Sequence, residues 1–306
     1  MKIICDTHCD TLSECFNNNY SIFKNPLSID IKKLSDYKSY TQFFASFINP
    51  QKKECTLYNH LKILNYFNQE IRKYPDEICL LKSFSDLENS TQKIKAFLSV
   101  EGADFIDKIS DLDILYENGV RMLSLTWNYE NRFAGGAYSK EKGLTKSGEL
   151  LIKNMEELGI ILDLSHANKK TFFDTVKIAT KPFVLSHSNS YGLCKNIRNI
   201  TKEQFKIVME TGGVVGINYY PLFLNNSDSA SIDDIVKHIE YFLSLGGEDN
   251  ICLGSDFDGI EILPKGIKNV SDVKKIFEKL NRIGVNDSIK EKIAYKNIYR
   301  IMRICL

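Results

Sequence analysis

Eight short apolar runs, separated by segments with helical periodicity, constrain the fold of this 306-residue chain more than any other feature. Runs of this length predict buried strands, and helices between them predict parallel βαβ units. Eight such units are the number that closes a (β/α)8 TIM barrel. The predicted strands cover residues 2–5, 42–48, 95–100, 120–126, 160–164, 183–186, 213–218 and 251–255.

The predicted helices complete this α/β alternation. They cover residues 29–37, 57–73, 85–90, 106–116, 145–158, 169–178, 201–210, 231–245, 271–282 and 287–302. A doubly wound open sheet would show the same alternation, but it usually carries a phosphate loop, and neither GxGxxG nor GxxxxGK is present. No linker or low-complexity block divides the chain, so we expect one barrel domain over residues 1–306.

Composition narrows the class of partner. Lys and Arg number 40 against 39 Asp and Glu, so the net charge is +1 and no basic field favours nucleic acid or an anionic membrane. A small-molecule substrate is therefore expected. No apolar segment reaches the length of a membrane span, and no signal peptide is apparent. The eight cysteines form no CxxC pair and indicate reduced, structural thiols, so we expect a cytoplasmic protein.

Polar residues stand at or just after the carboxyl ends of five predicted strands. This is the face of a barrel on which active sites are built. The residues are His8, Glu101, His166, His187 and Asp256. The other two histidines, His60 and His238, lie within predicted amphipathic helices and are expected to be structural.

The segment Asp6-Thr7-His8-Cys9-Asp10 follows the first strand directly. Alternation along an extended backbone would place Asp6, His8 and Asp10 on one side. Burying two carboxylates and an imidazole is costly unless a cation compensates them, and these ligand types suit a zinc-like ion. The alternative is a strand end whose aspartates cap a turn and whose histidine is solvated.

The candidate ligands are too numerous for one tetrahedral zinc. His8, Asp10, Glu101, His166 and His187 would serve two ions that share Glu101 as a bridge. A two-metal centre activates water and clamps a substrate oxygen, so hydrolysis is the expected chemistry. Asp256 is the candidate base, whereas Asp258 in the same Asp-Phe-Asp-Gly segment is expected to cap a turn.

Seven motifs in order give the chain a recognisable signature: DTHCDTL, SVEGAD, LTWNYEN, GIILDLSHAN, PFVLSHSNSYGL, NIRNIT and LGSDFDG. This ordered set resembles the membrane dipeptidase (renal dipeptidase) family of zinc peptidases, and the resemblance covers nearly the whole chain. It implies a binuclear zinc site that cleaves dipeptides, including some with a C-terminal D-residue, through a hydroxide bridging the metals. His8 and Asp10 would hold one zinc, Glu101 would bridge, and His166 and His187 would hold the other.

The resemblance also implies the substrate contacts. Arg198 would pair with the free carboxylate of the dipeptide, and Tyr220 would assist it. The mammalian enzymes have a histidine where this chain has Trp127, followed by Asn128. A donor to the developing oxyanion would then be missing, for which Asn128 or Asn131 could substitute, while Trp127 would make the pocket wall apolar.

Two rival functions remain open at the level of sequence. One is a metal-dependent barrel hydrolase acting on another amide, a lactone or a phosphoester, since barrel and metals do not define the substrate. The other is a non-catalytic metal-binding barrel, against which the retained Asp256 argues. The mammalian relatives are secreted and lipid-anchored, so the resemblance transfers the chemistry and not the location. Dimers are common among barrel enzymes, and a homodimer is a further expectation without identified interface residues.

Overall fold

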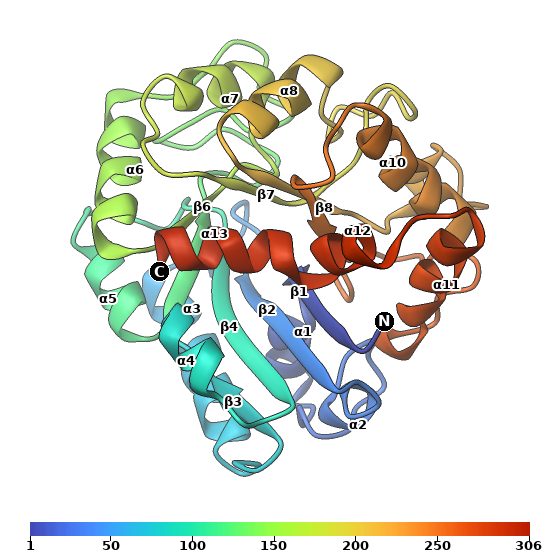
Figure 1. Ribbon diagram of the computed structural model, residues 1–306. Coiled ribbons are helices and arrows are strands. Elements are labelled where there is room, and N and C mark those ends of the chain that lie inside the picture. Colours follow the sequence, from blue (N-terminus) through green and yellow to red (C-terminus); the bar gives the residue numbers. More distant parts are fainter.

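A computed structural model describes all 306 residues and shows a closed barrel of parallel strands surrounded by helices (Figure 1). The strands follow the order β2-β1-β9-β8-β7-β6-β5-β4-β3, and a pairing between β2 and β4 closes the ring. The predicted (β/α)8 barrel is confirmed. The strands are β1 (Ile3–Cys9), β2 (Ser39–Phe47), β3 (Ile78–Leu80), β4 (Ile94–Glu101), β5 (Val120–Ser124), β6 (Ile161–Asp163), β7 (Val184–Ser188), β8 (Val214–Ile217) and β9 (Ile251–Leu253).

Strand β3 was not predicted and lies outside the ring of eight. It pairs with the first residues of β4, from Ile94 to Ala96. The later residues of β4, from Leu98 to Val100, pair instead with β5. Because β3 is only three residues long, its apolar run carries too little alternation to mark a strand in the sequence.

The helices mostly begin where their capping residues predict. Thr145, Asn168 and Thr201 each accept a backbone hydrogen bond at the start of a helix, and Thr201 forms a capping box with Gln204. The helices are α1 (Thr11–Asn18), α2 (Ile31–Leu34), α3 (Leu57–Ile71), α4 (Phe84–Asn89), α5 (Asp111–Glu117), α6 (Lys146–Leu158), α7 (Lys169–Val176), α8 (Lys202–Glu210), α9 (Pro221–Leu224), α10 (Ile232–Ser244), α11 (Lys274–Arg282), α12 (Asp287–Glu291) and α13 (Asn297–Cys305).

The helices differ from the prediction in five places. Helices α1 and α9 were not expected, and α2 and α5 are shorter than the predicted segments 29–37 and 106–116. The predicted helix 287–302 is divided by a π-helical turn over Lys292–Lys296. These segments are short or polar, and packing against the barrel decides their conformation rather than local propensity.

Helix α13 lies across one end of the barrel (Figure 1). Its Ile298, Ile301 and Met302 pack in one buried cluster with Val184 and Val214, the first residues of β7 and β8. A larger apolar cluster joins the strands to the outer helices. The amino-terminal end of the barrel is therefore filled, and the carboxyl-terminal end is left for a site. None of the helices combines the length and the apolar character that crossing a bilayer requires.

Candidate active site

Five strands bring the predicted ligands and the predicted base together at the carboxyl-terminal end of the barrel. All six side chains are buried. His8 and His187 lie within β1 and β7, Glu101 ends β4, and His166 and Asp256 follow β6 and β9. Asp10 occupies the N-cap position of α1, but its carboxylate makes no capping hydrogen bond and is free to face the cluster.

One carboxylate oxygen lies at the centre of this cluster. Oε1 of Glu101 is 2.6 Å from Nε2 of His166, 3.4 Å from Nε2 of His187 and 3.9 Å from Nε2 of His8. On the other side, Nε2 of His8 is 3.3 Å from Oδ2 of Asp10. Two groups of possible ligands, one with His8 and Asp10 and one with His166 and His187, thus share Glu101.

The cluster is short of positive charge. Burial lowers the pKa of His8, but the carboxylates of Glu101, Asp10 and Asp256 outweigh burial and raise this pKa to about 10. Burial raises the pKa of Asp10 to about 6. Nε2 of His8 and Oδ1 of Asp10 are buried without a hydrogen-bond partner. Buried polar atoms rarely lack partners, so the residues present fit a bound metal cation.

The other two histidines of the cluster, His166 and His187, are neutral. Burial is the main reason that the pKa values of His166 and His187 lie well below the ordinary value; the charge of Arg198 lowers the pKa of His166 further, and the charge of His8 lowers both. Neutral imidazole is the form that binds a metal ion. A third possible group contains His8, His187 and Asp256, so position alone does not separate Asp256 from the ligands.

Asp256 is held differently from the predicted ligands. Its backbone is left-handed, with φ of 63°, a conformation that aspartate tolerates better than most residues. Nδ2 of Asn218 donates to its Oδ2 at 2.9 Å, and its Oδ1 lies 3.7 Å from Nε2 of His8. Burial foremost, with the charges of Asp10 and Glu101, raises the pKa of Asp256 to about 7. A carboxyl group with a pKa near neutrality can both accept and donate a proton.

Gly259 is required by the crowding around Asp256. A Cβ atom at Gly259 would lie 2.1 Å from Oδ2 of Asp10 and 2.7 Å from Oδ1 of Asp256. The last glycine of the LGSDFDG motif therefore leaves space for two carboxylates of the cluster. The two short distances also show that the loop after β9, which carries Gly259, lies against the cluster.

Two neighbours of the cluster do not face it. The side chain of Asp6 accepts hydrogen bonds from the backbone N–H groups of His8 and Ser255, so the expectation that Asp6 converges with His8 and Asp10 was wrong. Asp258 was expected to cap a turn, but its side chain accepts instead from Thr11 and from the N–H of Ser28, which are distant in the chain. Its φ of 67° turns the chain, so Asp258 does not continue the alternation of a strand.

A network that the sequence analysis missed orients His187. Nδ1 of His187 lies 2.8 Å from Oγ of Ser186, and this hydroxyl donates to Oδ2 of Asp163 at 2.6 Å. Asp163 also accepts from the N–H and the hydroxyl of Ser165. The available signal in the sequence was Asp163 itself, a charged residue at the end of a buried strand. Such partners fix the ring orientation of a metal-binding histidine.

The four predicted substrate contacts line one cavity above the cluster, with a volume of about 890 Å³. These are Arg198, Trp127, Asn128 and Tyr220. Trp127 lies at an apolar part of the wall, where its ring packs against Phe47 at 5.4 Å between centroids. Asn128 also has a second contact, because its Oδ1 lies 2.9 Å from Nδ1 of His166.

Arg198 brings an unpaired positive charge to the cavity. It is 4% exposed, Nη1 donates to the carbonyl of Ser165, and Nη2 lies 2.6 Å from Nε2 of His166. No carboxylate pairs with it. Burial lowers the pKa of Arg198, yet a guanidinium stays charged, so an anionic group of a ligand would be stabilised here.

Comparison with known proteins identifies the family to which this chain belongs. Residues 1–305 match the membrane dipeptidase family, peptidase family M19. The chain belongs to this family. It is 35% identical over 240 residues to an uncharacterised Klebsiella pneumoniae protein encoded in the pqqA 5′ region, covering 74% of this chain and 88% of that protein. An uncharacterised dipeptidase of Schizosaccharomyces pombe is 34% identical over 216 residues, which is 69% of this chain and 53% of the yeast protein.

Solved structures share the fold of this family member. A Rhodobacter sphaeroides metallopeptidase, solved with a phosphinate mimic of the dipeptide L-Ala-D-Ala, superposes with a TM-score of 0.89 at 22% identity, covering 99% of both chains. The M19 metallopeptidase dipeptidase AC superposes with a TM-score of 0.90 at 22% identity, covering 100% of this chain and 99% of the other. Membership of the M19 family makes the chain a metal-dependent hydrolase of the dipeptidase class.

Proposed function

We propose that this M19 family member cleaves dipeptides at a site that holds two zinc ions, bridged by Glu101. The observation that carries the proposal is the position of Oε1 of Glu101, which faces histidine nitrogens of both ligand groups. His8 and Asp10 would hold one ion, and His166 and His187 the other. Nitrogen and oxygen ligands of this kind suit zinc.

Divalent ions at this site would supply Lewis acidity and make a water molecule nucleophilic near neutral pH. The protein's own part is proton transfer and positioning. Asp256 would accept the proton of the attacking water and deliver it to the amine that leaves. The hydrogen bond from Asn218 would hold one oxygen of Asp256 and keep the other directed at the cluster.

Arg198 would select the substrate. A guanidinium can donate two parallel hydrogen bonds to a carboxylate, and Arg198 has no protein carboxylate as partner. The free C-terminal carboxylate of a dipeptide would form the missing ion pair with Arg198. Tyr220 would assist Arg198 in binding this carboxylate, and Trp127 would form an apolar wall around the C-terminal residue. The phosphinate mimic bound by the Rhodobacter sphaeroides relative leads us to include L-D dipeptides.

The proposal is tested with a substrate panel. Zinc-loaded protein is offered L-L and L-D dipeptides, the corresponding N-acyl amides, a lactone and a phosphotriester, each with and without a chelator. We expect chelator-sensitive cleavage of dipeptides that exceeds cleavage of every other substrate. Cleavage of the lactone or phosphotriester in preference to dipeptides would contradict the proposed substrate. It would not contradict the metal site.

We further propose that residues 1–306 act as one cytoplasmic catalytic unit. All eight cysteines are free, which is typical of a reducing compartment. Cell fractionation tests the location. Light scattering of the purified protein tests the expected homodimer, and a monomer mass would contradict it.

A further inference from the structure

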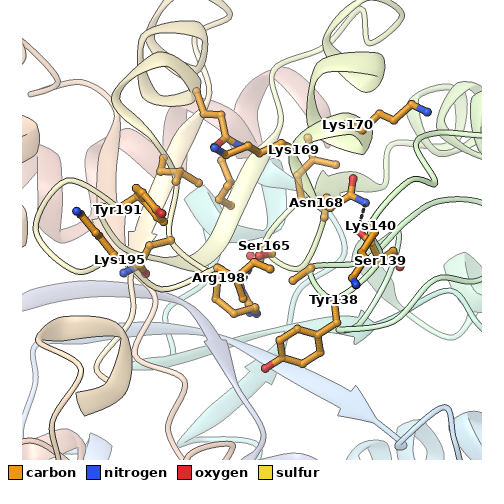
Figure 2. Close-up of a pocket in the computed structure, with 18 residues that line it drawn as sticks. Tyr138, Ser139, Lys140, Ser165, Asn168, Lys169, Lys170, Tyr191, Lys195 and Arg198 are labelled. Carbon is orange, nitrogen blue, oxygen red and sulfur yellow. Dashed lines mark hydrogen bonds between the residues drawn. The ribbon is translucent and has the colours of Figure 1, made fainter.

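A second cavity, of about 690 Å³, lies beside the catalytic one. Figure 2 shows Tyr138 and Lys140 on one side of it, Tyr191 and Lys195 on the other, and Arg198 between them. Tyr138 and Arg198 line both cavities, so the two are neighbours. The mechanism proposed above makes no use of this second space.

The charge of this cavity is of one sign. Its lining includes Lys140, Lys169, Lys170, Lys195 and Arg198 and no aspartate or glutamate. None of the four lysines forms an ion pair, although ten other lysines of the chain do. In a chain with a net charge of +1, this is a local excess of positive charge around a hollow.

Helix α7 increases this excess. Lys169 and Lys170 are its first two residues, and its first turn contains no acidic side chain. The amino terminus of a helix carries a partial positive charge, so lysines are unfavourable there and an anion is favourable. Nζ of Lys169 lies 5.5 Å from the ring centroid of Tyr191, and Lys170 donates to the carbonyl of Glu141. Neither contact neutralises the charge.

The walls of the cavity are fixed by bonds between its loops. Nδ2 of Asn168, the N-cap of α7, donates to the carbonyls of Ser139 and Lys142, and Gly136 forms a β-bridge with Ala167. On the other side, a β-bridge between Ser190 and Ile200 closes the loop that carries Tyr191 and Lys195. The lysines are therefore anchored on a hollow that is already formed.

We propose that this second cavity binds a small organic polyanion, one that carries two or more phosphate or carboxylate groups. Lys140, Lys169 and Lys195 carry more charge than a single carboxylate would neutralise, whereas Lys170 points away from the hollow (Figure 2) and donates to the carbonyl of Glu141. Tyr191 offers an aromatic face to an organic body between the charges. Arg198 and the carbonyl of Ser165, to which it donates, lie between this site and the catalytic one.

Binding is tested by calorimetry on the metal-loaded protein, with naphthalene trisulfonate as probe because sulfonates are weak metal ligands. We expect one probe per chain. The double variant Lys169→Ala/Lys195→Ala should weaken binding about tenfold or more, since it removes two of the charged contacts. The control Lys24→Ala/Lys93→Ala removes two exposed lysines without ion pairs elsewhere on the surface and should bind the probe like the parent protein. Absence of saturable binding, or equal affinity in the two double variants, would overturn the proposal.

Two further arms identify the source of the anion. Displacement of the probe by bisphosphoglycerate but not by tricarballylate would support an organic phosphate, and the reverse would support a polycarboxylate. If the probe does not bind and Lys169→Ala/Lys195→Ala lowers kcat/KM for L-Ala-L-Glu but not for L-Ala-L-Gln, the cavity serves the substrate's own side chain and the separate site is wrong. This last arm rests on the proposed function, whereas calorimetry does not, so failure of either is recognised separately.

Discussion

Oδ1 of Asn128 lies 2.9 Å from Nδ1 of His166. If Nδ1 carries the proton, it donates to Asn128, and Nε2 faces Glu101 as an unprotonated nitrogen that accepts from Nη2 of Arg198 at 2.6 Å. Asn128 was expected to contact the substrate, and its position at the cavity wall allows that contact as well. We infer from this contact that Asn128 positions His166, one of the proposed metal ligands.

Replacing Asn128 tests this role. We expect Asn128→Ala to weaken metal binding about 10- to 100-fold, the usual effect of removing the partner of a metal-binding histidine. Asn128→Asp keeps an acceptor and should retain most of the affinity. Competition with a chromogenic chelator measures both variants. An unchanged metal affinity with a raised KM would instead make Asn128 a substrate contact alone.

Asp256 is expected to be needed for turnover and not for the metals. Asp256→Asn should lower kcat by about 10²- to 10⁴-fold, the usual contribution of a general acid or base, while both ions stay bound. Asp258→Asn is the matched control, since Asp258 bonds to Thr11 and Ser28 and should affect stability more than turnover. Metal analysis and kinetics of both variants decide the matter. Loss of one ion in Asp256→Asn would make Asp256 a ligand.

Arg198 is expected to discriminate between a dipeptide and its C-terminal amide. Removing one partner of a buried charge pair costs about 2–5 kcal/mol, so Arg198→Ala should lower kcat/KM for the free acid by roughly a hundredfold or more. The amide lacks the carboxylate, so kcat/KM for the amide should fall much less. Arg198→Lys keeps the charge without the paired donors, so its kcat/KM for the free acid should lie between those of the parent protein and Arg198→Ala. Equal losses for acid and amide would show that Arg198 acts on the cluster and not on the carboxylate.

His60 is expected to make the fold acid-sensitive. Its ring is buried against Phe105, Nδ1 bonds to Ser46, and burial lowers its pKa to about 3. The unfolded chain binds a proton at His60 below about pH 6.5, and the folded chain does not until about pH 3. The free energy of unfolding should therefore fall, as pH falls through this window, by about 1.4 kcal/mol per unit from this residue.

The comparison variant for this prediction is His60→Gln. Urea denaturation at several pH values between 7 and 4 should give it a slope shallower than the parent protein's by about one proton. Other titrating groups, His238 among them, contribute equally to both proteins. Parallel slopes would mean that His60 takes up a proton in the folded state.

The sequence predicted that the candidate ligands lie together because these residues stand at strand ends. His8, Glu101 and His187 project from β1, β4 and β7, and a barrel brings all strand ends to one face. Bonds between neighbouring strands could not be predicted in the same way. The link from Asp163 through Ser186 to His187 depends on the register of β6 and β7 and on side-chain rotamers.

Backbone conformation accounts for the other differences. The φ values above 60° at Asp256 and Asp258 turn the chain after β9, and alternation of side chains does not extend across such a turn. Strand β3 and the short helices α1 and α9 owe their conformation to the barrel they pack against. The second cavity has no sequence motif, because its lysines come from two separate loops and from the start of α7.

The most direct test of the account is a zinc titration of metal-depleted protein, with dipeptide cleavage measured at each addition. Glu101 is shared by both ligand groups, so we expect activity to rise until two zinc ions are bound per chain, and we expect Glu101→Gln to weaken both sites together. Full dipeptide cleavage with one ion bound, or none with two, would contradict a bridged two-metal dipeptidase.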